Sequence, residues 1–277
     1  MTHNPSAEAA RPGPGRTAVV IPAAGRGVRL GPGTPKALRP LGGVPMLVHA
    51  VRAMARSTDV GPIVVVAPAD DVPAVRSLLD GHPLPDRVTL RVVPGGDTRQ
   101  ESVRLGLAAI AGGTGGVAGP HASDAPDDGV DVVLVHDAAR PLVPVATVDA
   151  VVAAVRAGAP AVVPALPVTD TVKQVAPPAD RDPADPEPVV ATPERASLRA
   201  VQTPQGFDRA VLVAAHEAAV TGADAGDAAT DCAGLVERRG VPVVLVRGHE
   251  EAFKVTRPLD LLLAEAVLAR RSVADGW

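Results

Sequence analysis

Short runs rich in valine and isoleucine alternate along this chain with stretches in which apolar residues have helical spacing, and this alternation restricts the possible folds. The Val/Ile-rich runs cover residues 17–22, 62–68, 87–93, 130–137, 160–166 and 241–248. The stretches with helical spacing cover residues 46–54, 72–79, 101–110, 145–155, 210–219 and 259–269. Strands and helices in this order predict βαβ units, and therefore an α/β, Rossmann-like fold with a mainly parallel sheet flanked by helices on both faces.

Two segments interrupt the alternation. Residues 111–129 are rich in Gly, Pro and Asp, and we expect them to form a mobile insertion. Residues 167–207 have extended ends, a Pro/Asp-rich middle and no helical spacing, which predicts a β-arm that projects from the body. The sequence shows no internal repeat and no second core. We therefore expect a disordered tail over residues 1–16 and a single domain over residues 17–277.

The composition excludes several classes of protein. The net charge of −4 does not favour a broad nucleic-acid surface, and aromatic residues, at 1%, leave little on which bases could stack. No apolar segment approaches the roughly 20 residues of a membrane-spanning helix. The only cysteine, Cys232, cannot form an intramolecular disulfide, which favours a reducing environment. We therefore expect a cytoplasmic protein that binds neither nucleic acid nor a membrane.

The loop after the first strand consists of small and basic residues. Small residues let backbone N–H groups approach an anion closely, so we identify a candidate phosphate site at Ala23, Ala24, Gly25 and Gly27. The spacing matches neither a Walker A loop nor a dinucleotide fingerprint, and an ordinary tight turn explains the loop equally well. Arg29 and Lys36 favour the phosphate site, because neighbouring cations repel each other unless an anion or solvent screens them.

A second loop with small residues follows the third strand. Gly95 and Gly96 permit close backbone approach, and Asp97 can accept a hydrogen bond from a hydroxyl or a base amine. Ser102 lies in the first turns of the following helix, whose N-terminus favours an anion. A glycine-rich turn followed by an Asp or Thr helix cap is the alternative interpretation, and only the position of the loop favours a ligand site.

Asp137 directly follows the fourth strand, at the edge where α/β sheets bind their ligands. A carboxylate there is a candidate Mg²⁺ ligand beside a nucleotide, and a helix cap is the alternative. Arg140 has the geometry to bind a phosphate, whereas His136 points to the opposite face and is expected to be structural. Lys254 lies between the last strand and the last helix. A single lysine is usually solvated, so we assign it to the site only because the other candidate residues are present.

Eight motifs occur in one order along the chain, and their combination is more specific than any of them alone. They are PAAGRGVRL, PKAL, GGDTRQESV, VHDAARP, PVTDTVK, QTPQGF, ATD and KVTRPLDL. In these motifs and their order the chain resembles the 2-C-methyl-D-erythritol 4-phosphate cytidylyltransferase family of the non-mevalonate isoprenoid pathway. The resemblance extends from about Ala18 to the last helix.

The resemblance implies a nucleotide site. The backbone from Ala23 to Gly25 would hold the phosphates of CTP, and two cations would stabilise charge at the reacting phosphorus, namely Arg29 and Lys36. The matching positions for cytosine and ribose are Gly96, Asp97 and Ser102. Asp137 matches the ligand of the Mg²⁺ cofactor.

The resemblance also implies a substrate site that two subunits share. The matching positions around methylerythritol phosphate are Arg140, Asp170, Thr171, Arg195, Thr203, Thr230, Asp231 and Lys254. Of these, Arg195 and Lys254 would hold the incoming phosphate and therefore take part in catalysis. In the family the arm crosses to a second subunit, so the chain is expected to form a homodimer in which Thr171 and Arg195 serve the neighbouring site.

The activity implied by the resemblance is transfer of CMP from CTP to 2-C-methyl-D-erythritol 4-phosphate, with release of pyrophosphate. Two alternatives remain open: a cytidylyltransferase for another polyol phosphate such as ribitol 5-phosphate, and a catalytically silent homologue that binds a nucleotide and regulates a partner. The chain departs from the family at Ala252-Phe253, where Asn-Ile is frequent, and at Cys232, where an acidic residue is common. These departures adjoin the implied contacts and do not replace them.

Overall fold

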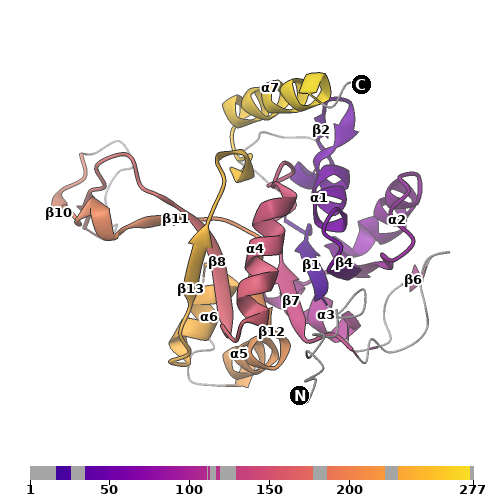
Figure 1. The fold of residues 1–277 in the computed structure, drawn as a ribbon, viewed down its shortest axis with the longest axis horizontal. Coiled ribbons are helices and arrows are strands. Elements are labelled where there is room, and N and C mark those ends of the chain that lie inside the picture. Colours follow the sequence, from indigo (N-terminus) through magenta and orange to yellow (C-terminus); the bar gives the residue numbers. More distant parts are fainter. Residues whose placement is uncertain are drawn as a thin grey trace, which may run out of the picture.

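The computed structural model describes residues 17–25, 35–110, 112, 117–118, 129–176, 186–221 and 230–274. Among these residues a nine-stranded sheet forms the centre of the molecule, with helices on both faces (Figure 1). In spatial order its strands are β11 (Arg199–Val201), β8 (Ala161–Pro167), β12 (Gln205–Asp208), β7 (Val132–Val135), β1 (Thr17–Pro22), β4 (Val60–Ala67), β5 (Leu90–Pro94) and β6 (Val117–Ala118), with β13 (Val244–Arg247) paired to β8.

Most of the sheet is parallel, as the alternating pattern predicts. Strand β1 pairs in parallel with β4 and β7, and β4 pairs in parallel with β5. Strand β12 is antiparallel to both β7 and β8, so β7 and β8 point in the same direction, and β13 is parallel to β8. The carboxyl ends of β1, β5 and β7 therefore lie at one edge of the sheet.

The helices divide between the two faces of the sheet according to the side-chain alternation of its strands. Val19 and Ile21 of β1 face one cluster, which contains residues of α1 (Met46–Ala55), α2 (Val72–Asp80) and α4 (Val145–Arg156). Ala18 and Val20 face the other cluster, which contains residues of α3 (Arg99–Ile110), α5 (Arg209–Thr221) and α6 (Cys232–Arg238). Because both faces are covered, the strand is apolar throughout, and this explains its continuous Val/Ile pattern.

A third, smaller cluster joins the C-terminal helix to a short hairpin before α1. Helix α7 (Pro258–Ala274) contributes Ala264, and the hairpin of β2 (Pro40–Leu41) and β3 (Val44–Pro45) contributes Leu41. Gly42 and Gly43 form the turn of this hairpin with φ values of +58° and +80°, which favour glycine. The cluster anchors two segments that carry lysines of the candidate site, the 3₁₀ turn Lys36–Leu38 and the loop before α7.

The arm extends away from the body (Figure 1). Its outer part contains β9 (Gln174–Val175) paired antiparallel with β10 (Val189–Ala191), followed by a 3₁₀ turn at Arg195–Ser197. The range 167–207, assigned to the arm from sequence, also includes most of β12, whose residues are buried between β7 and β8. The segment that returns from the arm is therefore a strand of the central sheet, and α6 after it is a further element that the sequence did not predict.

Several sequence-based expectations fall outside the described residues, namely the tail 1–16, most of the insertion 111–129 and the arm tip 177–185. Within the described part of the chain, no helix combines the length and the apolar character needed to cross a bilayer.

Two buried histidines make the stability of this fold depend on pH. His136 after β7 and His216 in α5 are 0% and 1% exposed, and burial lowers the pKa of each from 6.5 to about 4. Between pH 6.5 and about 4 the unfolded chain therefore binds more protons than the folded chain. The free energy of unfolding should fall as the pH falls through this window.

We predict that His216→Gln reduces this pH dependence, by up to about 1.4 kcal/mol per pH unit for the loss of one linked proton. Urea unfolding at several pH values between 7.5 and 4.5 measures the slope. His249→Gln is the matched control, because His249 is exposed to solvent in the folded protein. A slope that His216→Gln leaves unchanged would show that His216 is not a buried neutral base.

Candidate active site

The carboxyl ends of β1, β5 and β7 border a cavity of about 280 Å³. Its position agrees with the rule that α/β sheets bind ligands beyond the carboxyl ends of their strands. Many of the residues expected from sequence line it, namely Ala23, Ala24, Gly25, Lys36, Gly96, Asp97, Ser102, Asp137 and Lys254. Gly27 and Arg29 lie outside the described residues.

The first wall of the cavity is the small-residue loop after β1. The N–H of Ala23 donates to the carbonyl of Val66 at 2.8 Å, which fixes the start of the loop to the neighbouring strand. Gly95, expected in the nucleotide site, lies behind this loop. A Cβ atom on Gly95 would be 2.7 Å from that of Ala24, so glycine is needed for the two loops to pack together.

The second wall is the start of α3, where two hydrogen bonds of Glu101 fix the backbone. The N–H of Glu101 donates to Oγ1 of Thr98 at 3.0 Å, and Oε2 of Glu101 accepts from the N–H of Asp97 at 3.0 Å. The hydroxyl of Ser102 lies 3.3 Å from the N of Gly96 and 3.4 Å from its carbonyl oxygen. The helix-cap interpretation of this loop is therefore confirmed at Thr98, and the exposed side chain of Asp97 remains available at the mouth of the cavity.

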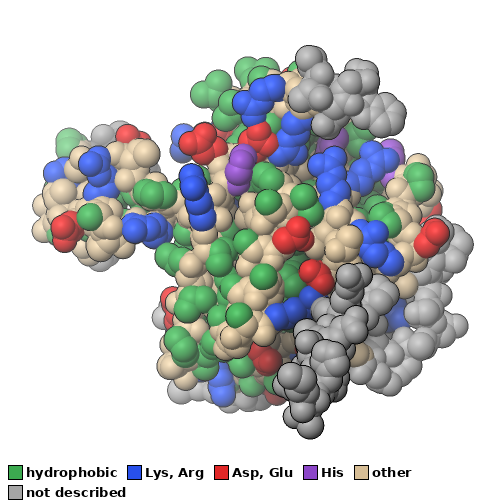
Figure 2. Space-filling model, viewed as in Figure 1, with side chains coloured by type: hydrophobic (Ala, Val, Ile, Leu, Met, Phe, Trp, Pro, Cys, Tyr) green, Lys and Arg blue, Asp and Glu red, His purple; other side chains and the backbone are tan. Residues whose placement is uncertain are grey.

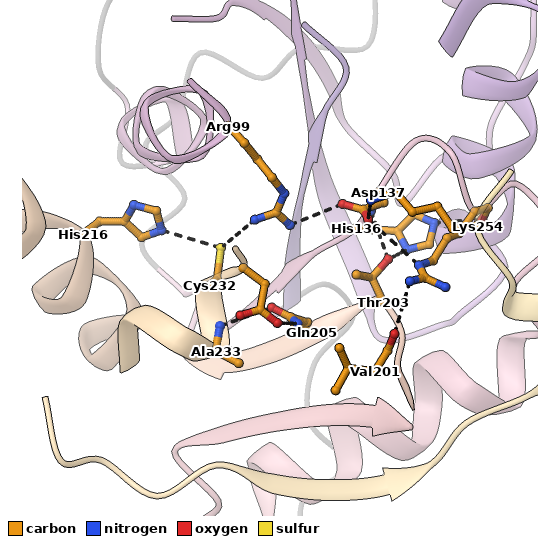
Figure 3. A network of polar contacts seen from close by, with 12 residues as sticks. Arg99, His136, Asp137, Val201, Thr203, Gln205, His216, Cys232, Ala233 and Lys254 are labelled. Atoms are coloured by element: carbon orange, nitrogen blue, oxygen red, sulfur yellow. Dashed lines mark hydrogen bonds and ion pairs between the residues drawn. The ribbon is translucent and has the colours of Figure 1, made fainter. Parts of the chain in front are cut away.

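Asp137 is the electrostatic centre of the site (Figure 3). Its side chain is 12% exposed, and Nζ of Lys254 lies 2.8 Å from Oδ2. Nη2 of Arg99 lies 3.3 Å from Oδ1, and Nε of Arg140 lies 3.9 Å from Oδ2. Burial alone would raise the pKa of Asp137, but these three positive charges hold it well below its usual range. The carboxylate is therefore ionised, and it does not cap a helix, because α4 begins only at Val145.

Arg140 binds backbone carbonyl groups in this structure, whereas from the sequence we assigned it to a phosphate. Its guanidinium donates to the carbonyl of Ala252 at 2.7 Å and to that of Val201 at 3.2 Å. The N–H of Val255 donates to the carbonyl of Ala139 at 2.8 Å. These bonds join the loop after β7 to the loop that carries Lys254, so the backbones that carry Asp137 and Lys254 are held together.

Arg99 and Thr98 are site residues that motif matching alone did not identify. The guanidinium of Arg99 lies between Asp137 and Cys232, with Nη1 3.6 Å from the sulfur (Figure 3). Burial raises the pKa of the Cys232 thiol to about 11 despite the adjacent guanidinium, so the thiol is neutral. The available signal was a cation two residues after Asp97, at the first turn of a helix that starts beside the predicted ligand site.

The remaining predicted residues lie away from the cavity. Asp170, Thr171 and Arg195 are exposed on the arm, where Nη1 of Arg195 donates to the carbonyl of Thr169 at 2.6 Å. Asp231 caps α6, since its Oδ1 accepts from the N–H of Gly234 at 2.9 Å. The two threonines differ: Thr230 is exposed, whereas Thr203 is 4% exposed and lies behind Asp137. Among the described residues, one copy of the chain therefore brings together most of those expected in the nucleotide site and leaves the arm residues apart.

A second cavity, of about 640 Å³, lies between α3 and α5. Its lining includes Arg104, Leu107, Arg209 and Val213, and contains none of the site residues expected from sequence. Position and chemistry therefore favour the smaller cavity as the active site.

Comparison with known proteins identifies the family of this chain. The family model described as 2-C-methyl-D-erythritol 4-phosphate cytidylyltransferase matches residues 17–270. A protein of that name from Streptomyces avermitilis is 65% identical over 269 residues, covering 96% of this chain and 98% of the relative. Another from Streptomyces coelicolor is 66% identical over 264 residues, covering 95% of this chain and 89% of the relative.

Solved structures of similar proteins share the fold. The 4-diphosphocytidyl-2C-methyl-D-erythritol synthase of Anaerococcus prevotii superposes with a TM-score of 0.69 at 26% identity, over 91% of this chain and 98% of the other. The cytidylyltransferase of Thermus thermophilus superposes with a TM-score of 0.62 at 35% identity, over 90% of this chain and 97% of the other. On the match of the family model and the identity to these relatives, the chain belongs to the 2-C-methyl-D-erythritol 4-phosphate cytidylyltransferase family.

Proposed function

We propose that this chain transfers CMP from CTP to 2-C-methyl-D-erythritol 4-phosphate and forms 4-diphosphocytidyl-2-C-methyl-D-erythritol and pyrophosphate. Membership of the family and the names of relatives at 65% and 66% identity support the substrates. The observation that carries the proposal is the buried, ionised Asp137 within a group of cations, beside a backbone loop built for close approach to phosphate.

The reaction is an in-line displacement at phosphorus. An oxygen of the substrate phosphate attacks the α-phosphorus of CTP, a new P–O bond forms, and the bond to the β-phosphate oxygen breaks. Pyrophosphate leaves with the electron pair of that bond. The attacking oxygen is already an anion, so no general base is required. The work of the protein is to bring two polyanions together and to stabilise the charge that develops at the α-phosphoryl group.

The charges of the site suit this task. Lys254, Arg99 and Arg140 surround one carboxylate, and Lys36 lines the cavity beside the loop after β1, so positive charge is in excess. The side chain of Lys254 is 39% exposed, which allows its ammonium group to turn from Asp137 to a phosphate. Lys36 would meet the developing charge, and we expect the same of Arg29.

The donor chemistry of Asp137 fits Mg²⁺. The carboxylate is ionised, it lines the cavity, and Mg²⁺ commonly takes one or two protein carboxylates together with phosphate oxygens and water. Asp137 would hold the ion, and bound Mg²⁺ would supply positive charge to the phosphate oxygens of the nucleotide. Across the residues that the structure describes, no cluster of three or more Asp, Glu, His or Cys side chains could hold a metal.

We propose that the base is read at the loop before α3. The exposed carboxylate of Asp97 can accept a hydrogen bond from a ribose hydroxyl or from the cytosine amino group, whereas the carbonyl at the same position of uracil is itself an acceptor. The two hydrogen bonds of Glu101 hold the backbone of this loop in place, which supports a role in selecting CTP over UTP.

We also propose a homodimer joined through the arm, in the cytoplasm. The arm exposes Val172, Val175, Val189, Val190 and Val201, and the edge strand β13 exposes Val244 and Leu245. Figure 2 shows hydrophobic side chains gathered on the face where Figure 1 places β8 and β13. Exposed valines along the projecting arm favour contact with a second copy, which would bring Thr171 and Arg195 to the partner's cavity.

The proposed reaction predicts pyrophosphate release only when the correct pair of substrates is present. Purified protein should release pyrophosphate with CTP and 2-C-methyl-D-erythritol 4-phosphate in Mg²⁺, and much more slowly with UTP or with ribitol 5-phosphate. A coupled pyrophosphate assay with all four pairs of substrates makes the test. Preference for ribitol 5-phosphate would change the assigned substrate, and CTP binding by calorimetry without turnover would indicate a silent homologue.

Lys36→Ala should lower kcat by about 10²–10³-fold while KM for CTP rises much less, because the lysine acts on charge that develops in the transition state. Steady-state kinetics with CTP as the varied substrate measures both constants. Arg239→Ala removes an exposed cation outside the cavity and serves as the control. Turnover of Lys36→Ala near that of the control would remove Lys36 from the mechanism.

If the arm of one copy completes the cavity of the other, loss of the dimer should lower activity. The unmodified chain should sediment as a dimer, and Val190→Asp should shift it towards a monomer with lower activity, because a charge replaces an exposed apolar contact. Sedimentation velocity and the pyrophosphate assay on the same samples provide the comparison. A fully active monomer would exclude a site completed by the partner's arm.

A further inference from the structure

A chain of three hydrogen bonds lies directly behind Asp137. The backbone N–H of Asp137 donates to Oγ1 of Thr203 at 3.0 Å, and that oxygen lies 3.1 Å from Nδ1 of His136. Nε2 of His136 lies 3.1 Å from the carbonyl oxygen of Arg140. Figure 3 shows Thr203 between Asp137 and His136. His136 is 0% exposed and Thr203 is 4% exposed, so these hydrogen bonds are shielded from water.

For a neutral imidazole, the partners of His136 decide which atoms of these hydrogen bonds carry the hydrogens. A carbonyl oxygen only accepts, so Nε2 of His136 must carry the hydrogen that it donates to Arg140. In a neutral imidazole the other nitrogen, Nδ1, then accepts, and its partner is the hydroxyl of Thr203. The hydroxyl hydrogen of Thr203 is therefore committed to His136, while its oxygen accepts from Asp137.

This arrangement changes the role of Thr203. A phosphate oxygen needs hydrogen-bond donors, and the hydroxyl of Thr203 has no further hydrogen to donate. The side chain also does not line the cavity that contains Asp137 and Lys254. The resemblance places Thr203 around methylerythritol phosphate, and in this geometry its hydroxyl hydrogen points to His136.

We propose that Thr203 and His136 are positioning residues that fix the backbone of Asp137 and thereby aim its carboxylate. The proposal rests on the proposed function of Asp137. The same hydrogen bonds extend to the loop of Lys254. His136 binds the carbonyl of Arg140, and the guanidinium of Arg140 binds the carbonyl of Ala252 beside that loop. One buried imidazole thus ties the two ends of the ion pair between Lys254 and Asp137 to a single framework.

Thr203→Val tests the proposal, because valine has nearly the shape of threonine and lacks the hydroxyl. We expect kcat to fall by about 10–100-fold, the scale of loss when reacting groups are slightly misplaced, with KM for the polyol phosphate within about twofold. Thr203→Ser retains the hydroxyl and should restore most of kcat. A large rise in KM for the polyol phosphate at unchanged kcat would mean a direct substrate contact and would overturn the proposal.

A second measurement needs no activity and separates this inference from the proposed function. Nitrogen NMR of the unmodified protein should show His136 as the neutral tautomer with hydrogen on Nε2, and Thr203→Val should shift the Nδ1 resonance as it loses its donor. Circular dichroism checks that the variant is folded. Should Thr203→Val not fold, the tautomer of the unmodified protein still decides: hydrogen on Nδ1 overturns the proposal, and hydrogen on Nε2 supports it.

Discussion

The arrangement of the site depends on the need to compensate one buried carboxylate. Asp137 is 12% exposed, and a buried charge without partners would cost several kcal/mol. Its three cations come from separate segments: Arg99 from the start of α3, Arg140 from the loop after β7, and Lys254 from the loop before α7. The ion pairs of Asp137 therefore hold the start of α3 and the loop before α7 against the loop after β7, and Arg99, Asp137 and Lys254 line the cavity between them.

Much of the fold could be predicted from sequence, because each buried strand shows its burial in its own residues. A parallel strand covered on both faces must be apolar along its length, so the Val/Ile runs identify β1, β4, β5, β7, β8 and β13 within a few residues. Strand β12 was predicted only as an extended end of the arm and not as a strand of the central sheet, because its residues QGFD carry no run of β-branched side chains. Its place between β7 and β8 is decided by tertiary pairing, which leaves no local pattern in the sequence.

Sequence predicted those residues of the site that directly follow a strand. Asp137 and the small-residue loop were found by that rule, and both line the cavity. The partners of Arg140 and the burial of Thr203 were not predictable, because they join residues 112 and 66 positions apart, respectively, in the sequence. Motif resemblance placed both residues near the substrate without distinguishing a side chain that touches a ligand from one that holds the site together. For the arm residues the distinction depends on a second copy of the chain.

The neutral thiol next to Arg99 has a consequence for the chemical durability of the site. Cysteines beside a cation are commonly reactive, because the positive charge stabilises the thiolate. At Cys232 burial outweighs that effect, and with a pKa of about 11 only about one molecule in 10,000 carries the thiolate at pH 7. Cys232 is 1% exposed as well, so peroxide and alkylating reagents meet little thiolate and have little access to it. The wall behind Arg99 should therefore remain unmodified under oxidative stress without help from a reductant.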